Sequence, residues 1–237
     1  MQLKTVLFDL DGTLLPLDQD VFVKEYLASM CSFMAKHGYD KSAFLSAVWD
    51  GIRTMEKNDG SHKNEDVFME RFRDAMGHPI ERELTLLEEY YDTDFQNVKS
   101  VCGQNPKAKE TLTLCHRLGL RTVLATNPLF PRIATESRIR WAGLSPEDFE
   151  LVTTYENSKA AKPNPLYYEL LTKQLGVLPE ECLMVGNDAR DDMIAKTLGI
   201  KVFLLTDCLL NRENADLSPY PKGNFDDLMY HIDALTK

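Results

Sequence analysis

The sequence predicts an α/β fold in which a parallel sheet has helices on both faces and a helical bundle is inserted near its beginning. Short apolar segments recur after Asn105 and alternate with amphipathic helical segments, which is typical of a parallel sheet covered by helices. Residues 18–96, in contrast, show helical periodicity and almost no strand signal. A chain of 237 residues, 43% of them hydrophobic, is long enough to bury a sizeable core around such a sheet.

The first expected strand, Thr5–Leu10, is separated from the later sheet by this helical segment. Four apolar stripes with 3–4 spacing predict four amphipathic helices, and each helix must bury its stripe against the others. The stripes run over residues 22–34, 44–55, 67–76 and 84–91. We therefore expect two domains: residues 17–97 form a helical domain, and residues 1–16 with 98–237 form a discontinuous α/β domain.

Helices and strands are then expected in alternation. The expected helices span residues 107–118, 131–142, 165–175 and 191–198, and the expected strands span residues 121–125, 150–153, 182–185 and 201–205. The first strand belongs with these strands, because a lone strand cannot satisfy its backbone groups inside a helical bundle. The sequence thus predicts a Rossmann-like parallel sheet, followed by a polar loop over Thr206–Asn224 and a last helix over Phe225–Leu235.

Composition and charge exclude several classes of partner. The formal net charge is −10 and no run of Lys or Arg occurs, which argues against binding to a nucleic-acid backbone or an anionic membrane. Five cysteines without a CxxC pair are typical of reduced thiols. The sequence contains neither a signal-peptide pattern nor an apolar run of about 18 residues that could span a bilayer. We therefore expect a cytoplasmic protein; nothing in the sequence indicates its oligomeric state.

Unusual polar residues follow each of the strands that should form the centre of the sheet. Ligands of open parallel sheets bind beyond the carboxyl ends of the strands. The polar residues expected at this edge are Asp9, Asp11, Thr126, Asn127, Lys162, Asn187, Asp188, Asp191 and Asp192. The sequence therefore predicts that segments far apart in the chain meet at one site.

The residue types at this edge suit phosphoryl transfer. Crowded carboxylates repel one another unless a cation neutralises them, and oxygen ligands without His or Cys favour Mg²⁺. A lysine and a small hydroxyl beside the ion would bind phosphoryl oxygens, and an aspartate can act as the nucleophile. Read one at a time, the same residues have plainer explanations: Asp-Gly is a common turn, and Asp188, Asp191 and Asp192 could serve only the start of the next helix.

Four short motifs occur in order: FDLDGTL, ATN, KPNPLYY and MVGNDARDDM. Together they resemble the haloacid dehalogenase (HAD)-like phosphohydrolase superfamily, over residues 1–16 and roughly 98–237. The helical insertion falls where that family places its first type of cap. The resemblance implies an Mg²⁺-dependent phosphatase that hydrolyses a small phosphorylated metabolite through an aspartyl-phosphate, with a helical cap domain over residues 17–97.

The resemblance also implies a role for each matching residue. Asp9 would be the nucleophile and Asp11 the general acid and base, whereas Thr126, Asn127 and Lys162 would hold the phosphoryl group. The Mg²⁺ ligands would be Asp9, Asp11 through its carbonyl, and Asp188. Asn187 and Asp192 would contact these ligands without binding the ion themselves.

The fourth motif permits two alignments. Asp188 and Asp192 are four residues apart, whereas Asn187 and Asp192 are five apart, and both spacings occur in the family. We prefer Asp188 as the metal ligand because a neutral Asn would bind Mg²⁺ more weakly. The position of Asp191 in this scheme stays open.

Two other functions fit the same motifs. A phosphomutase would pass the phosphoryl group to a second sugar hydroxyl, and a family-like domain that had lost catalysis would serve as a binding protein. A dehalogenase is disfavoured, because that branch does not use the second Asp of the DxD pair and Asp11 is present. The sequence does not identify the physiological substrate.

Overall fold

The computed structural model describes residues 2–237, and a six-stranded parallel sheet lies at its centre. The strand order is β3-β2-β1-β4-β5-β6, so the first strand joins the later strands, as expected, and lies in the middle of the sheet. The strands are β1 (Thr5–Phe8), β2 (Arg121–Leu124), β3 (Leu151–Val152), β4 (Cys182–Gly186), β5 (Lys201–Leu205) and β6 (Lys222–Gly223). Phe8 at the end of β1 is in register with Leu124 of β2 and Val185 of β4, so the carboxyl ends of these three strands are level.

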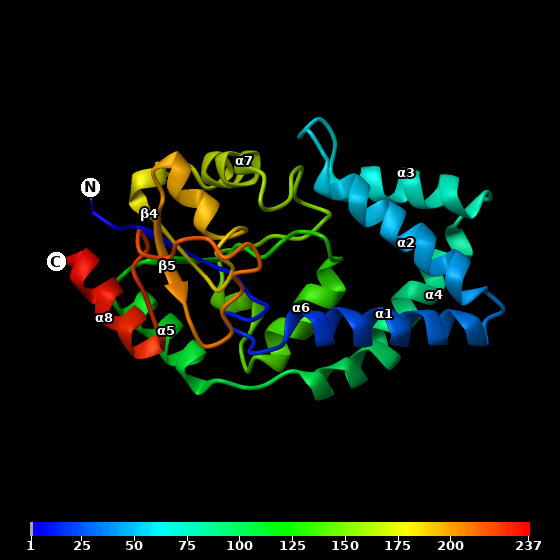
Figure 1. The fold of residues 1–237 in the computed structure, drawn as a ribbon, viewed down its shortest axis with the longest axis horizontal. Coiled ribbons are helices and arrows are strands. Elements are labelled where there is room, and N and C mark those ends of the chain that lie inside the picture. Colours follow the sequence, from blue (N-terminus) through cyan, green and yellow to red (C-terminus); the bar gives the residue numbers. More distant parts are fainter. Residues whose placement is uncertain (1) are drawn as a thin grey trace.

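Helices cover both faces of this sheet (Figure 1). One face carries α5 (Pro106–Arg117) and α8 (Phe225–Thr236), and the other carries α7 (Pro165–Leu175). Side chains of β1 alternate between the two apolar cores: Val6 and Phe8 pack on the first face, and Leu7 packs on the second. The predicted α/β fold with a Rossmann-like parallel sheet is confirmed.

The four predicted helices of the insertion are present and extend away from the sheet (Figure 1). They are α1 (Gln19–Lys36), α2 (Lys41–Glu56), α3 (Asn64–Met76) and α4 (Glu81–Asp92). Asp18 and Asp40 cap the first two helices, because their side chains accept hydrogen bonds from backbone N–H groups of the first turn. A 3₁₀ helix, η1 (Asp94–Val101), leads back to the sheet. The division into two domains at residues 17 and 97 stays a prediction.

Aromatic side chains pack between the insertion and the sheet domain. Phe95 of η1 contacts Tyr26 of α1, with ring centroids 5.7 Å apart, and Trp141 of α6 (Arg132–Trp141), with centroids 4.9 Å apart. One apolar core therefore runs from the sheet into the helical insertion.

Two expectations for the second half of the chain were wrong in detail. The segment expected as a helix over residues 191–198 forms only a 3₁₀ helix, η4 (Met193–Leu198). Its start is held instead as a turn, in which Asp188 Oδ1 accepts hydrogen bonds from the N–H groups of Arg190 and Asp191. The loop expected over residues 206–224 contains the two-residue strand β6, which pairs with the end of β5.

No helix in residues 2–237 combines the length and the apolar character that crossing a membrane requires. The five cysteines all carry free thiols.

Candidate active site

The level carboxyl ends of β1, β2 and β4 open into a cavity of about 1020 Å³. Every site residue expected from the sequence lines it: Asp9, Asp11, Thr126, Asn127, Lys162, Asn187, Asp188, Asp191 and Asp192. The helical insertion also contributes to the lining, through Gln19 at the start of α1 and Glu56 at the end of α2. The parallel sheet thus brings the four motifs to one place.

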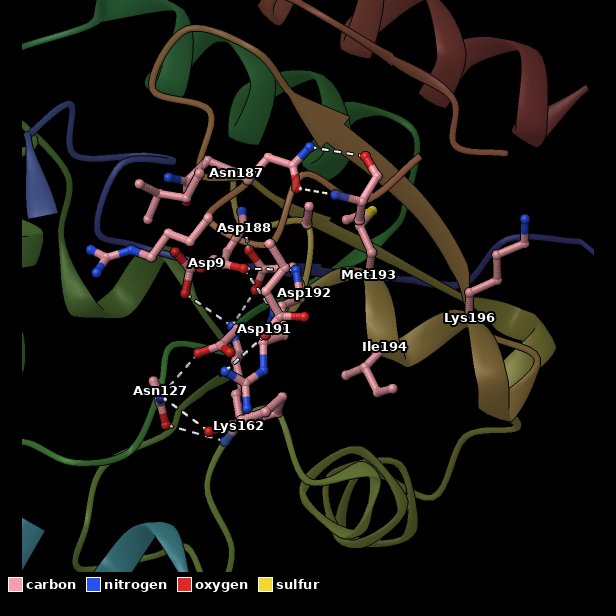
Figure 2. A pocket seen from close by; sticks show the side chains of 18 of the residues that line it. Asp9, Asn127, Lys162, Asn187, Asp188, Asp191, Asp192, Met193, Ile194 and Lys196 are labelled. Carbon is pink, nitrogen blue, oxygen red and sulfur yellow. Dashed lines mark hydrogen bonds and ion pairs between the residues drawn. The ribbon is translucent and has the colours of Figure 1, made fainter. Parts of the chain in front are cut away.

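The Lys162 side chain reaches the acidic residues of this group, as the dashed lines in Figure 2 show. Its Nζ atom is 2.9 Å from Asp9 Oδ1 and 2.7 Å from Asp192 Oδ1, and the lysine is buried. Burial alone would lower the pKa of Lys162, but the carboxylates of Asp192 and Asp9 raise it well above the usual value. The ammonium group therefore stays charged beside Asp9.

Asn127 holds the backbone of Lys162 in place. The amide of Lys162 donates to Asn127 Oδ1 over 3.2 Å, and Asn127 Nδ2 donates back to the carbonyl of Lys162 over 3.4 Å. Thr126 precedes this asparagine at the end of β2 and is buried. Its carbonyl accepts hydrogen bonds from the hydroxyls of Thr153 and Tyr167, so the backbone of this motif is fixed from behind.

The turn after β1 brings Asp9 close to Asn187. Gly12 has φ +79°, and a Cβ atom there would lie 2.3 Å from Asn187 Nδ2, so no other residue fits this turn. The hydroxyl of Thr13 donates to Asn187 Oδ1 over 3.0 Å and lies 3.3 Å from Asp9 Oδ2. Sequence reasoning gave Thr13 no role, although it belongs to the FDLDGTL motif.

The side chains of the fourth motif have different surroundings. Asn187 Nδ2 donates to the carbonyl of Cys208 over 2.7 Å, which leaves Asn187 Oδ1 on the side of Thr13 and Asp9. Asp192 Oδ2 accepts from the N–H of Asp188 over 3.0 Å, while Asp188 Oδ1 caps the following turn. The structure thus brings Asn187, rather than Asp188, into contact with the turn that carries Asp9.

Asp191 belongs to the fourth motif and lines the cavity next to Asn127 of the second motif. Its Oδ2 lies 3.5 Å from Asn127 Nδ2, and the hydroxyl of Tyr168 donates to its carbonyl over 2.9 Å. Burial, followed by the neighbouring Asp188 carboxylate, raises the pKa of Asp191 to about 6. Burial disfavours the charged form of two other carboxyls in the cavity as well: it raises the pKa of Asp192 to about 7, and it raises the pKa of Asp11.

Asp11 forms an ion pair with a residue that sequence reasoning missed. Arg138 of α6 is fully buried, and its guanidinium donates to Asp11 Oδ2. Burial raises the pKa of Asp11 above its ordinary value, and the charge of Arg138 opposes this rise. One feature of the sequence points to Arg138. It lies four residues after Ala134, so the two residues share one face of α6, and this face is buried.

A second group that sequence reasoning missed joins the helical insertion to the motif loops. Asn64, at the start of α3, is fully buried and donates to the carbonyls of Pro128 and Ala160 over 3.1 and 3.2 Å. Asn58 Nδ2 in turn donates to Asn64 Oδ1 over 2.8 Å. The insertion is thus hydrogen-bonded to the loops that carry the second and third motifs.

The oxygen atoms around Asp9 fit a hard cation that completes its coordination with other ligands. Within residues 2–237, no group of three or more His, Cys, Asp or Glu side chains is arranged to hold a metal ion. Mg²⁺ usually keeps several waters and is bound through one or two carboxylates plus substrate phosphate, rather than by an all-protein cage. The carboxylate of Asp9, the carbonyl of Asp11 and one side chain of the fourth motif would provide a donor set of this kind.

Comparisons with known proteins agree with this architecture. A family model described as haloacid dehalogenase-like hydrolase matches residues 3–199. Pyrophosphatase PpaX from Bacillus cereus (strain AH820) is 26% identical over 85% of this chain and 82% of that protein.

Solved structures share the fold at low sequence identity. An HAD phosphatase from Thermococcus onnurineus superposes with a TM-score of 0.58, 22% identity and coverage of 97% of this chain and 98% of that one. A 2-haloacid dehalogenase from Pseudomonas syringae pv. Tomato DC3000 superposes with a TM-score of 0.64 and 18% identity, covering 98% of both chains. The family and the enzyme class predicted from the sequence are confirmed: the chain belongs to the haloacid dehalogenase-like hydrolase family.

Proposed function

We propose that the protein is an Mg²⁺-dependent phosphatase that hydrolyses a small phosphorylated metabolite through an aspartyl-phosphate on Asp9. The observation that carries this proposal is the buried ammonium of Lys162, 2.9 Å from Asp9 Oδ1. A charge-assisted contact of this kind orients the carboxylate and places a positive charge where phosphoryl oxygens would lie. The PpaX relatives, which are pyrophosphatases by name, support a phosphate-bearing substrate.

The proposed reaction has two displacement steps at phosphorus. In the first, a carboxylate oxygen of Asp9 attacks phosphorus, the bond to the leaving alcohol breaks, and the Asp11 carboxyl gives the alcohol its proton. In the second, Asp11 takes a proton from water, the hydroxide attacks phosphorus, and Asp9 is released with inorganic phosphate. Lys162, Thr126 and the backbone N–H of Asn127 hold the phosphoryl oxygens during both steps.

Mg²⁺ would be held by Asp9, by the carbonyl of Asp11 and by a side chain of the fourth motif. When bound, it would supply charge neutralisation for the transferred phosphoryl group. The sequence favoured Asp188 for the last position, whereas the contacts of Thr13 with Asn187 Oδ1 and Asp9 favour Asn187. Asp192 supports the site by pairing with Lys162 and does not contact the ion in this proposal.

The helical insertion, residues 17–97, would act as a cap over the core formed by residues 1–16 and 98–237. Gln19 and Glu56 line the cavity from this side, so the insertion helps to select the leaving group. A closed cap would exclude water during phosphoryl transfer and open for product release. Leu17 and Cys102 form a bridge between the two connecting segments, which is where such a motion would be centred.

Other properties of the chain fit a small phosphorylated metabolite as the substrate. The net charge of −10 disfavours a nucleic-acid or membrane partner. Five free thiols suit the reducing cytoplasm. The dehalogenase neighbour shares the fold at 18% identity, but the intact pair Asp9 and Asp11 favours hydrolysis of a phosphate ester.

A screen for released phosphate tests the proposal. The protein would be incubated with pyrophosphate, acetyl phosphate and a set of small phosphate esters, with Mg²⁺ or with EDTA. We expect Mg²⁺-dependent release from at least one substrate, and no release by a folded Asp9→Asn variant. Retained activity in Asp9→Asn, or activity unaffected by EDTA, would overturn the proposal.

A further inference from the structure

Arg138 is a fully buried arginine next to the acidic pair, and none of the four motifs contains it. Its Nε atom donates to the carbonyl of Ala134 over 3.3 Å, and its Nη2 atom donates to the hydroxyl of Thr135 over 3.2 Å. Its Nη1 atom pairs with Asp11 Oδ2. Local contacts within α6 therefore fix the direction in which the guanidinium meets Asp11.

Aromatic rings pack against the guanidinium of this ion pair. The guanidinium carbon lies 4.0 Å from the ring centroid of Phe130 and 5.9 Å from that of Phe22. A cation over an aromatic face is attracted to the ring, and the burial of Arg138 strengthens the interaction of its guanidinium with a carboxylate. Burying an arginine is costly unless it is paired, so the arrangement calls for a role that an apolar residue could not fill.

The two oxygen atoms of Asp11 are used differently. Oδ2 is held by Arg138, whereas Oδ1 is buried and has no hydrogen-bond partner in the described part of the chain. Asp11 also lines the cavity that contains Asp9 and Lys162. Binding one oxygen fixes the plane of the carboxyl group, and the other oxygen has no protein partner that would compete with a substrate.

We propose that Arg138 is the positioning residue of Asp11. By holding Oδ2, it keeps Oδ1 in place to give a proton to the leaving alcohol and then to take one from the attacking water. This inference rests on the proposed phosphatase function and adds to it a residue outside the motifs, supplied by a helix of the core domain.

A comparison of leaving groups tests this role. The substrates are the best phosphate ester from the screen, whose alkoxide must be protonated as it leaves, and acetyl phosphate, whose acetate leaves without a proton. General acid catalysis contributes about 100-fold or more, so Arg138→Met should lower kcat/KM for the ester by about that factor. For acetyl phosphate the loss in kcat/KM should be at least about tenfold smaller, because acetate leaves without needing a proton from Asp11. Equal losses for both substrates would overturn the inference.

Two further variants separate positioning from folding. Arg140→Met changes an exposed arginine on the same helix and should leave both kcat/KM values unchanged. Arg138→Lys keeps the charge but loses the planar guanidinium with its several N–H donors. The difference between its kcat/KM losses for the two substrates should therefore lie between those of wild type and Arg138→Met. If Arg138→Met does not fold, Arg138→Lys tests the inference alone. An equal loss of kcat/KM for both substrates in Arg138→Lys would then overturn the inference.

A double-mutant cycle with Asp11→Asn tests whether Arg138 acts through Asp11. In the Asp11→Asn background, Arg138→Met should cause little further loss with the ester, because the group that it positions is already disabled. Multiplicative losses would overturn the inference while leaving the phosphatase function standing. A wild type that hydrolyses neither substrate would instead overturn the proposed function, and the role of Arg138 with it.

Discussion

The Nζ atom of Lys162 donates to Asp192 Oδ1 over 2.7 Å, and each side chain is only 1% exposed. Gly186 makes this contact possible, because a Cβ atom at that position would lie 2.0 Å from Asp192 Oδ2. The pair fixes the lysine so that the same ammonium also reaches Asp9, 2.9 Å away. Removing Asp192 should therefore affect stability and the position of the lysine together.

We expect Asp192→Ala to lower the free energy of unfolding by about 3 to 5 kcal/mol, since it leaves part of a buried ion pair uncompensated. Urea unfolding followed by circular dichroism measures this change. The matched control is Asp233→Ala, which removes an exposed pair with Lys237 and should cost less than about 1 kcal/mol. If both substitutions lower the free energy of unfolding equally, the buried pair stabilises the fold no more than the exposed pair does.

The two candidate metal ligands of the fourth motif can be separated by exchanging their charges. If Asn187 Oδ1 binds Mg²⁺, Asn187→Asp adds a negative ligand and should lower the Mg²⁺ concentration for half-maximal activity several-fold. Asp188→Asn should leave that concentration nearly unchanged, because Asp188 Oδ1 already caps a turn. A large rise in the required Mg²⁺ in Asp188→Asn alone would instead favour the assignment made from the sequence.

The sequence predicted which residues lie together where strand ends determine their position. Asp9 and Lys162 are 153 residues apart in the chain, yet their meeting followed from parallel strands that end at one edge of the sheet. The first strand was expected to join the strands of the later α/β segment, and the structure confirms this. Alternation of helices with short apolar strands therefore carries most of the information about this fold.

The contacts that sequence reasoning missed depend on side-chain packing across elements. Arg138 lies in a helix rich in charged residues, and its burial depends on Phe130 and Phe22, which no local pattern links to it. Asn64 is likewise an ordinary polar residue at a helix start until its carbonyl partners are known. In the fourth motif, spacing alone allowed either Asn187 or Asp188 beside Asp9, and only the turn at Gly12 distinguishes them.

Asn64 should stabilise the docking of the helical insertion onto the motif loops. Asn64→Ala removes the donor to the carbonyls of Pro128 and Ala160 and leaves buried polar groups without a partner. We expect a loss of about 1 to 3 kcal/mol in the free energy of unfolding, together with a higher KM. Lys63→Ala, a change at the exposed neighbour, is the control and should leave both values within error. An unchanged KM in a destabilised Asn64→Ala would mean that docking does not influence substrate binding.

Asp191 should make stability depend on pH between its unfolded and folded pKa values. Because burial and Asp188 raise its pKa from 3.8 to about 6, the folded protein binds this proton more tightly than the unfolded chain does. The stability from this proton is fully present below about pH 4 and is lost as the pH rises through about 6. The ionised carboxylate then costs up to about 3 kcal/mol, since one pKa unit corresponds to about 1.4 kcal/mol.

Asp191→Asn removes the ionisation and keeps the size of the side chain. In EDTA, the variant should gain stability over wild type as the pH is raised from 4 to 7, with the difference levelling off above the folded pKa of about 6. Urea unfolding at a series of pH values measures the difference between the two proteins. The exposed Asp216, whose pKa is lowered by hydrogen bonds from Ser218, is a suitable control, because Asp216→Asn should show no such gain. A difference that is constant with pH would mean that Asp191 is as well solvated in the folded protein as in the unfolded chain.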